Sequence, residues 1–393
     1  TSRIDLNESL KEGARTAAFL NSKGAQRISP ALVIGELALT LALLVRAGLL
    51  IKSFLRLCAV EPGYDPRNLL TMLIPLDFTK YPPGSEQQRR FYQDLLAGLN
   101  TLPGVKAAAL GPLPLAGIKR SVGPPSGSGS SIPSGSQNDI SPNYFQAMGM
   151  RLLAGRGLTE QDRLGAQDVL VISETMARRQ FPGQNPIGKH LKLGGTWDQT
   201  IVGVVGDVKR YGLEAETNSQ CYHSILQCRK MYREIDLVIR TAGDPMELAS
   251  AVREQIWALD SNQPVGNVMS MEQRLAESVA PRRFQMVLFG AFAAAALIIA
   301  AIGIYGVVSY AVSQRTPEIG IRMALGAQVG DVLKMVVWRG MGLPLIGVTI
   351  GLVAALVLTR VMKSMLFNVS VTDPATFTLI ALLLLAVVLI ATY

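Results

Sequence analysis

The feature that most constrains this chain is an uncharged stretch that starts at Phe284 and ends before Arg315. It holds roughly 31 residues, which span about 46 Å as an α-helix. The hydrocarbon core of a bilayer is about 30 Å thick, and about 20 apolar residues cross it. A helix of this length therefore crosses a membrane and projects beyond one face as a stalk.

Apolar residues are gathered in four blocks, at 31–51, 284–312, 340–359 and 375–393. The whole chain is 17% charged, whereas soluble domains average about 25%. Each block is long enough to cross a bilayer as a helix. We therefore predict a membrane α-helical protein with four transmembrane helices and a large extracytoplasmic α+β domain.

The predicted segments follow from these blocks. Residues 1–29 form a cytoplasmic amphipathic segment, whose helix at 4–18 either lies on the membrane surface or is an exposed linker. The others are transmembrane helix 1 at 30–53, the extracytoplasmic domain at 54–282, the stalk with helix 2 at 283–312, a cytoplasmic coupling loop at 313–339, helix 3 at 340–360, an outer loop at 361–373 and helix 4 at 374–393.

The charge distribution orients the protein. Residues 54–282 carry 24 Lys and Arg against 22 Asp and Glu, so most of the +9 net charge lies beside the spans. This near balance argues against nucleic-acid binding by the domain. Basic residues are numerous in segments 1–29 and 313–339, which the positive-inside rule places in the cytoplasm, although Lys52 and Arg56 favour the opposite orientation.

The extracytoplasmic domain contains an internal repeat of one strand–helix–strand pattern. Two strand–helix–strand patterns are visible, at 68–110 and at 235–269, and they predict two βαβ units as in a split ferredoxin-like module. Between them, Gly, Ser and Pro dominate residues 121–136, and residues 140–225 indicate a strand-rich inserted lobe. Its predicted elements are strands at 169–172 and 200–205 and a helix at 176–181.

No catalytic, cofactor or metal site is predicted. His190 and His223 have no acidic or cysteine partner at metal-ligand spacing, and phosphate-binding and nucleophile motifs are absent from the sequence. The three cysteines are an odd number, so either Cys221 and Cys228 pair or all three thiols are unpaired.

Small and charged residues mark the predicted packing sites in the membrane. Gly347 and Gly351 form a G-x-x-x-G pattern, which lets two helices approach closely. Gly303 and Gly306 likewise leave one face of the second span without bulky side chains. Glu36 is a charge inside the first span. It either contacts a neighbouring helix or handles protons or substrate.

The polar element at 313–327 follows the stalk directly. Glu318 and Arg322 are four residues apart and support a helical turn, and apolar side chains follow at Ile319, Met323 and Leu325. Two interpretations stay open: a docking helix for a soluble partner, or a turn that contacts lipid headgroups.

Residues 315–327, which read RTPEIGIRMALGA, resemble the signature of MacB/FtsX-type ABC transporter permeases. Further similar segments are LAGR at 153–156, FPGQNPIGK at 181–189, VGVVGDV at 202–208, EPGYDP at 61–66 and SVTDP at 370–374. The subgroup that the chain resembles most is the duplicated orphan permeases of acidobacterial type, of which it would be the second half.

The resemblance implies a non-catalytic subunit of the bacterial inner membrane that pairs as a homodimer or with a homologous half. It implies that a separate cytoplasmic ABC ATPase docks on the coupling loop, and that ATP-driven movement passes along the stalk to the outer domain in export or efflux. The residues it assigns to this coupling are Arg315, Glu318, Ile319, Arg322, Met323 and Leu325. The alternative is an FtsX-like signalling or scaffold permease that regulates an envelope enzyme.

Overall fold

A computed structural model describes residues 25–114, 135–193, 197–227, 234–313, 316–326, 328, 330, 342–361, 369–370 and 372–392. The chain divides into two compact units. One is the outer domain, Ala59–Pro281, and the other, the membrane unit, combines the segments Thr1–Cys58 and Arg282–Tyr393. The predicted amphipathic helix at 4–18 lies outside the described residues.

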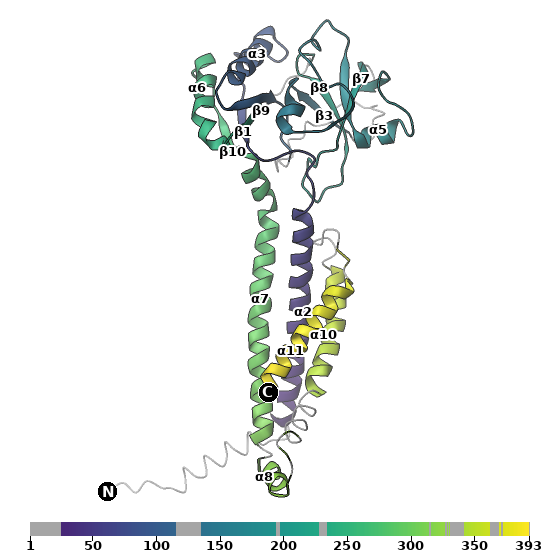
Figure 1. Ribbon diagram of the computed structural model, residues 1–393, viewed down its shortest axis with the longest axis vertical. Helices are drawn as coiled ribbons and strands as arrows, with labels where there is room; N and C mark the ends of the chain where they lie inside the picture. The colour runs from purple at the N-terminus through teal and green to yellow at the C-terminus, as the bar shows by residue number, and fades with distance from the viewer. Residues whose placement is uncertain are drawn as a thin grey trace, which may run out of the picture. The chain divides into compact units, whose positions relative to one another are not determined.

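A four-stranded antiparallel sheet forms one half of the outer domain (Figure 1). Its spatial order is β10-β1-β9-β2, and α3 connects β1 to β2 while α6 connects β9 to β10. Because β1 and β2 both run antiparallel to β9, they are parallel to each other, and each helix closes a βαβ unit. The bounds are β1 Leu69–Pro75, α3 Glu86–Asn100, β2 Val105–Leu110, β9 Glu234–Thr241, η1 Pro245–Leu248, α6 Ala249–Leu259 and β10 Gly266–Ser270.

Local sequence explains these elements. Ser85 caps α3 because its side chain accepts a hydrogen bond from the Gln88 amide, and Phe91, Leu95 and Leu99 then follow at helical spacing. These side chains are buried in one core with the inner residues of the sheet. β1 is a central strand that is buried on both faces, which explains why its sequence, LLTMLIP, is apolar except for Thr71.

The inserted lobe contains a six-stranded mixed sheet. Its path is β3-β8-β5-β7-β4, and β6 also pairs with β7. The predicted strands at 169–172 and 200–205 correspond to β5 and to part of β7, while β3, β4, β6 and β8 were not predicted individually. The bounds are β3 Gly135–Ile140, α4 Tyr144–Met148, β4 Leu152–Gly155, β5 Val169–Ser173, α5 Glu174–Gln180, β6 His190–Leu193, β7 Trp197–Val205 and β8 Ser219–Ser224.

Four helices with long apolar runs and one short helix account for the described membrane-associated segments. They are α2 Ala25–Cys58, α7 Met271–Ser313, α8 Thr316–Ala324, α10 Gly342–Val361 and α11 Pro374–Thr392. Three of them, α2, α7 and α11, are long and apolar enough to cross a membrane. The apolar part of α10, Pro344–Arg360, is shorter, so a fourth span stays a prediction.

The long helix α7 begins earlier than the sequence indicated. The apolar run starts at Phe284, but the helix starts at Met271 and continues past Pro281 to Ser313. A capping box explains the earlier start: the Gln273 amide donates to Ser270 Oγ at 3.1 Å, and the Ser270 amide donates to Gln273 Oε1 at 3.0 Å. Its 43 residues correspond to a length of about 65 Å.

Candidate coupling and membrane-packing sites

Helices α2 and α10 are in close contact at the two glycines of the G-x-x-x-G pattern. A Cβ atom added at Gly347 would lie 2.9 Å from Leu37 Cβ, and one added at Gly351 would lie 3.0 Å from the Cα of Ala38. Contacts this short leave no room for a larger side chain, so the two backbones approach each other through these residues. The structure thus places both glycines against the same helix.

The contact between α2 and α7 is of a different kind. A Cβ atom added at Gly303 would lie 2.7 Å from Glu36 Oε2, so the Glu36 carboxylate fills the space beside this glycine. One turn further along α2, the Thr40 hydroxyl donates to the Ala296 carbonyl at 3.3 Å. Gly306, by contrast, has nothing within 4 Å of its added Cβ. The sequence predicted a packing role for both glycines, but among the described residues only Gly303 contacts another helix at its added Cβ.

Two ionisable side chains of α2 contain buried atoms without a hydrogen-bond partner, Glu36 Oε1 and Arg46 Nε. Ten residues separate them, which is about 15 Å along a helix, so they cannot pair within α2. Buried polar atoms without partners are rare in native structures. The Glu36 carboxyl group lies at the contact with α7. Its Oε1 atom has no hydrogen-bond partner among the described residues.

Helix α11 is joined to α2 by an ion pair that sequence reasoning missed. Lys52 Nζ lies 2.6 Å from Asp373 Oδ2, and the same carboxylate accepts hydrogen bonds from the amide and hydroxyl of Thr376. The Lys52 hydrogen bond and then those of Thr376 lower the pKa of Asp373 to about 2. Asp373 therefore caps α11 and ties it to α2 at the same time.

The short helix α8 presents an ion pair and apolar side chains together. Arg322 Nη2 lies 2.8 Å from Glu318 Oε1, and Ile321, Met323 and Leu325 are exposed by 63, 48 and 82%. Gly326 ends the helix with φ of +98°, a conformation that favours glycine. Of the six predicted coupling residues, Arg315 lies outside the described residues, and Ile319 is described only in its backbone. Ile321 was not among them, although it lies one turn before Leu325.

The outer domain shows no metal-binding cluster of three or more His, Cys, Asp or Glu among its described residues. Cys58 is exposed and Cys221 is buried, with Cys221 Sγ 3.5 Å from His223 Nε2, and Cys228 lies outside the described part of the chain. Burial raises the pKa of Cys221 to about 12, so this thiol stays protonated and unreactive at neutral pH. Burial also lowers the pKa of His223.

Two family models and several curated proteins are similar to this chain in sequence. A model of the MacB-like periplasmic core domain matches residues 31–257, and a model of the FtsX-like permease C-terminal region matches residues 290–393. Among curated relatives, the probable syringafactin export ATP-binding/permease protein SyfD of Pseudomonas syringae pv. tomato is 30% identical over 55% of this chain and 33% of that protein. The uncharacterized ABC transporter permease YknZ of Bacillus subtilis is 28% identical over 55% of each chain.

Two solved structures are also similar, with low scores. The periplasmic region of MacB from Actinobacillus actinomycetemcomitans has a TM-score of 0.36 at 16% identity, covering 56% of this chain and 95% of that one. The extracellular domain of the noncanonic ABC-type transporter YknZ from Gram-positive bacteria has a TM-score of 0.32 at 17% identity, covering 51% of this chain and 99% of that one.

The family assignment rests on the two family models. The first covers more than half of the chain, and the second covers most of the remainder. The chain spans between about a third and about half of the length of the curated relatives just named. The described α+β domain, the apolar helices and the matched regions together identify the chain as a member of the MacB/FtsX-type ABC transporter permeases.

Proposed function

We propose that this chain is the membrane subunit of an ABC transporter in which a separate cytoplasmic ATPase drives movements of the outer domain. The observation that carries this proposal is the continuous helix α7. It begins directly after β10, the last strand of the outer domain, and two residues separate its end from the start of α8. Its length of about 65 Å is about twice the thickness of a bilayer core. A continuous helix of this length can transmit a displacement from one side of a membrane to the other.

The finer architecture belongs to the same proposal. We infer that α10 crosses the membrane as the fourth span, and that segments 1–29 and 313–339 face the cytoplasm of a bacterial cell with the outer domain beyond the inner membrane. The strand order β10-β1-β9-β2 with two βαβ units supports a split ferredoxin-like module.

Helix α8 is the proposed docking site of the ATPase. Its exposed apolar side chains next to the Glu318–Arg322 ion pair have the composition of a helix that inserts into a groove of a partner. The relatives that combine ATP-binding and permease parts are export proteins by name, which favours export as the process that this chain serves.

The full chain in lipid nanodiscs, mixed with candidate soluble ABC ATPases, tests this docking. Glu318→Lys reverses one charge of the ion pair and should lower ATPase association at least tenfold. Glu174→Lys is the matched control, because Glu174 pairs with Arg178 at the same i,i+4 spacing at 2.9 Å on α5 of the outer domain. Pull-down of the ATPase that Glu318→Lys leaves undiminished would refute the assignment.

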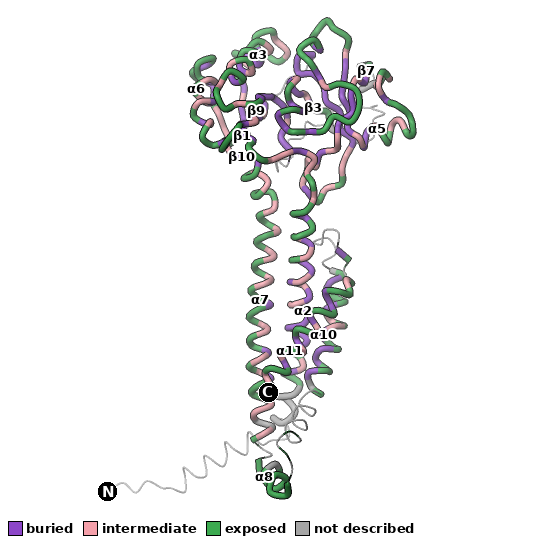
Figure 2. Tube along the Cα trace, viewed as in Figure 1, coloured by how far each residue is buried: buried purple, intermediate pink, exposed green. Residues whose placement is uncertain are grey.

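Pairing with a second copy or a homologous half is the second part of the proposal. Much of the apolar surface of α7 is exposed in the single chain (Figure 2). In a membrane this surface meets lipid or a second set of helices. The large exposed apolar side chains on this helix are Phe284, Val287, Leu288, Phe292, Ile298, Ile299, Ile302 and Tyr305.

The FtsX-like match over 290–393 favours one alternative, a signalling permease that regulates an envelope enzyme. Export predicts that an exported compound raises ATP hydrolysis by the reconstituted complex. Signalling predicts no such stimulation, together with capture of an envelope hydrolase by the outer domain. The two measurements on one preparation decide between these functions.

A further inference from the structure

A polar hollow of about 430 Å³ lies in the outer domain, next to the segment that leads from α2 into β1. Its volume falls in the range of small-ligand sites, which is about 300–1,000 Å³. Its lining contains three basic side chains, one carboxylate and two neutral amides, namely Arg67, Lys106, Arg240, Asp65, Asn68 and Gln146. Charged and polar side chains therefore outnumber apolar ones among the lining residues.

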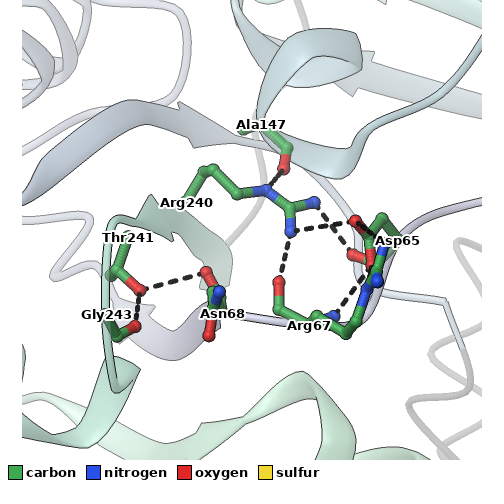
Figure 3. A network of polar contacts seen from close by, with 7 residues as sticks. All are labelled: Asp65, Arg67, Asn68, Ala147, Arg240, Thr241 and Gly243. Atoms are coloured by element: carbon green, nitrogen blue, oxygen red, sulfur yellow. Dashed lines mark hydrogen bonds and ion pairs between the residues drawn. The ribbon is translucent and has the colours of Figure 1, made fainter.

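Arg240 lines this hollow, and backbone carbonyls hold its guanidinium group in place (Figure 3). Its Nε donates to the Ala147 carbonyl at 2.9 Å, its Nη2 donates to the Asp65 carbonyl at 2.8 Å, and its Nη1 donates to the Arg67 carbonyl. Carbonyl groups orient the guanidinium without cancelling its charge. Burial lowers the pKa of Arg240, and a bound anion would offset this desolvation of the cation.

Asp65 is the only carboxylate among the described residues of the lining, and Arg67 engages both of its oxygens. Arg67 Nε lies 3.0 Å from Oδ1 and Nη2 lies 3.1 Å from Oδ2, whereas Arg240 Nη1 lies 3.9 Å from Oδ2. The Arg67 pair therefore neutralises most of this negative charge. The other nearby carboxylate, exposed Glu272, acts on Arg67 and raises its pKa, after the larger effect of Asp65.

Lys106 supplies the remaining positive charge. Its side chain is exposed and lines the hollow, and no hydrogen bond or ion pair of its ammonium is found within the described part of the chain. Because Asp65 neutralises most of the charge of Arg67, no carboxylate in the described lining neutralises the positive charges of Arg240 and Lys106. Such an excess of positive charge in a concave site attracts anions.

We propose that this hollow binds an anionic group, a phosphate or a carboxylate, which Lys106 and the guanidinium groups of Arg67 and Arg240 recognise. The headgroup of an anionic lipid and a soluble anion carry the same anionic chemistry, and the experiment below distinguishes them. The proposal goes beyond ATPase coupling and does not depend on it.

The rate of Lys106 acetylation by an amine-reactive ester, followed by mass spectrometry on the full chain, measures occupancy. Lys80 is the internal reference, since it is 54% exposed and pairs with Asp260 away from the hollow. In dodecyl maltoside, inorganic phosphate should slow acetylation of Lys106 at least fivefold relative to Lys80. Sodium chloride of equal ionic strength should not.

Nanodiscs distinguish the two sources of the anion. Protection of Lys106 by phosphatidylglycerol over phosphatidylcholine, without protection by phosphate in detergent, identifies a lipid headgroup. Protection by phosphate but not by phosphatidylglycerol identifies a soluble anion, and protection by both supports the shared chemistry. Absence of protection in every arm, or equal protection by chloride, would overturn the proposal.

Two variants link protection to the site. Arg67→Ala removes one donor and exposes the Asp65 carboxylate, and Gln146→Glu adds a carboxylate at an exposed position of α4. Each should raise the concentration of phosphate or anionic lipid needed for half protection about tenfold. Arg179→Ala, which removes an exposed cation of α5, is the matched control and should change nothing. Unchanged protection in both test variants would also contradict the site.

Discussion

Against α10, helix α2 presents Leu37, Ala38 and Leu41 to two glycines, whereas against α7 it presents Glu36 and Thr40. The first contact is made by backbones and short side chains that interlock. The second contains, among the described residues, one long hydrogen bond and a flexible carboxylate, and the backbones of α2 and α7 approach each other far less than those of α2 and α10. We infer that α2, α10 and α11 form a fixed group and that α7 is more loosely attached, as a moving helix would need to be.

Gly351→Leu should have the largest effect on this comparison. The new side chain would meet the Cα of Ala38 and the side chain of Leu41 at about the closest distances that real Cβ atoms show. Because a backbone atom cannot rotate away, α10 must separate from α2. Overpacking of this kind costs about 1–3 kcal/mol, which a clear drop in the melting temperature of the detergent-solubilised chain would register.

Gly306→Leu on α7 is the matched control for that variant. Nothing lies within 4 Å of its added Cβ, so the same substitution should leave the melting temperature nearly unchanged in the monomer. Equal destabilisation by both variants would contradict the view that α7 is loosely attached. A drop confined to nanodiscs would instead place a second copy beside Gly306.

Lys52→Met should have an intermediate effect with a defined pH dependence. It removes the ion pair with Asp373, whose partners are 32 and 17% exposed, so the loss should be about 1 kcal/mol. Since the folded pKa of Asp373 is lowered to about 2, and the ordinary value is about 3.9, the pair contributes fully above about pH 5. The contribution disappears as the pH falls toward 2, because the carboxylate becomes protonated in both states.

Melting temperatures of the parent chain and Lys52→Met, measured from pH 7 to pH 2, check this sign. The difference should be constant at the upper end and shrink below about pH 4. Lys52→Arg keeps the charge and serves as the control. If the difference in melting temperature instead grows as the pH falls, a titrating group other than Asp373 determines the pH dependence.

The sequence was sufficient for the elements whose apolar residues repeat regularly. The two βαβ units were predicted because Phe91, Leu95 and Leu99 mark a helix and the flanking strands are apolar. β8 was not recognised because its residues, SQCYHS, show no alternation, although all six are buried by the neighbouring strands. Burial of polar residues such as Gln220, whose amide donates to the Val208 carbonyl at 2.8 Å, depends on tertiary partners that no local pattern specifies.

The membrane contacts divide in the same way. Gly347 and Gly351 could be proposed from spacing alone because both lie on one helix face. Lys52 and Asp373 are 321 positions apart, and no local pattern connects them. The start of α7 could have been found, since Ser270 and Gln273 have capping-box spacing, but the charged residues between Met271 and Phe284 concealed the continuity of the helix.

Thr40→Val should have the smallest effect on stability. It removes the 3.3 Å hydrogen bond to the Ala296 carbonyl, and interhelical hydrogen bonds in membranes average about 0.6 kcal/mol. The change in melting temperature should therefore be slight, while the separation of α2 and α7 should become more variable. Spin labels at the exposed positions Leu39 and Ile302, in a chain whose cysteines are replaced, would report this as a broader distance distribution.

Thr349→Val on α10 controls for the substitution itself, because the Thr349 hydroxyl bonds only within its own helix, to the carbonyls of Leu345 and Ile346. It should leave the distance between α2 and α7 unchanged. If Thr40→Val destabilised the chain as strongly as Gly351→Leu, then α7 would be as firmly attached to α2 as α10 is. Movement of α7 past α2 would then require breaking a tight interface, and the outer domain would have to be driven through another connection, such as the segment between Cys58 and Leu69.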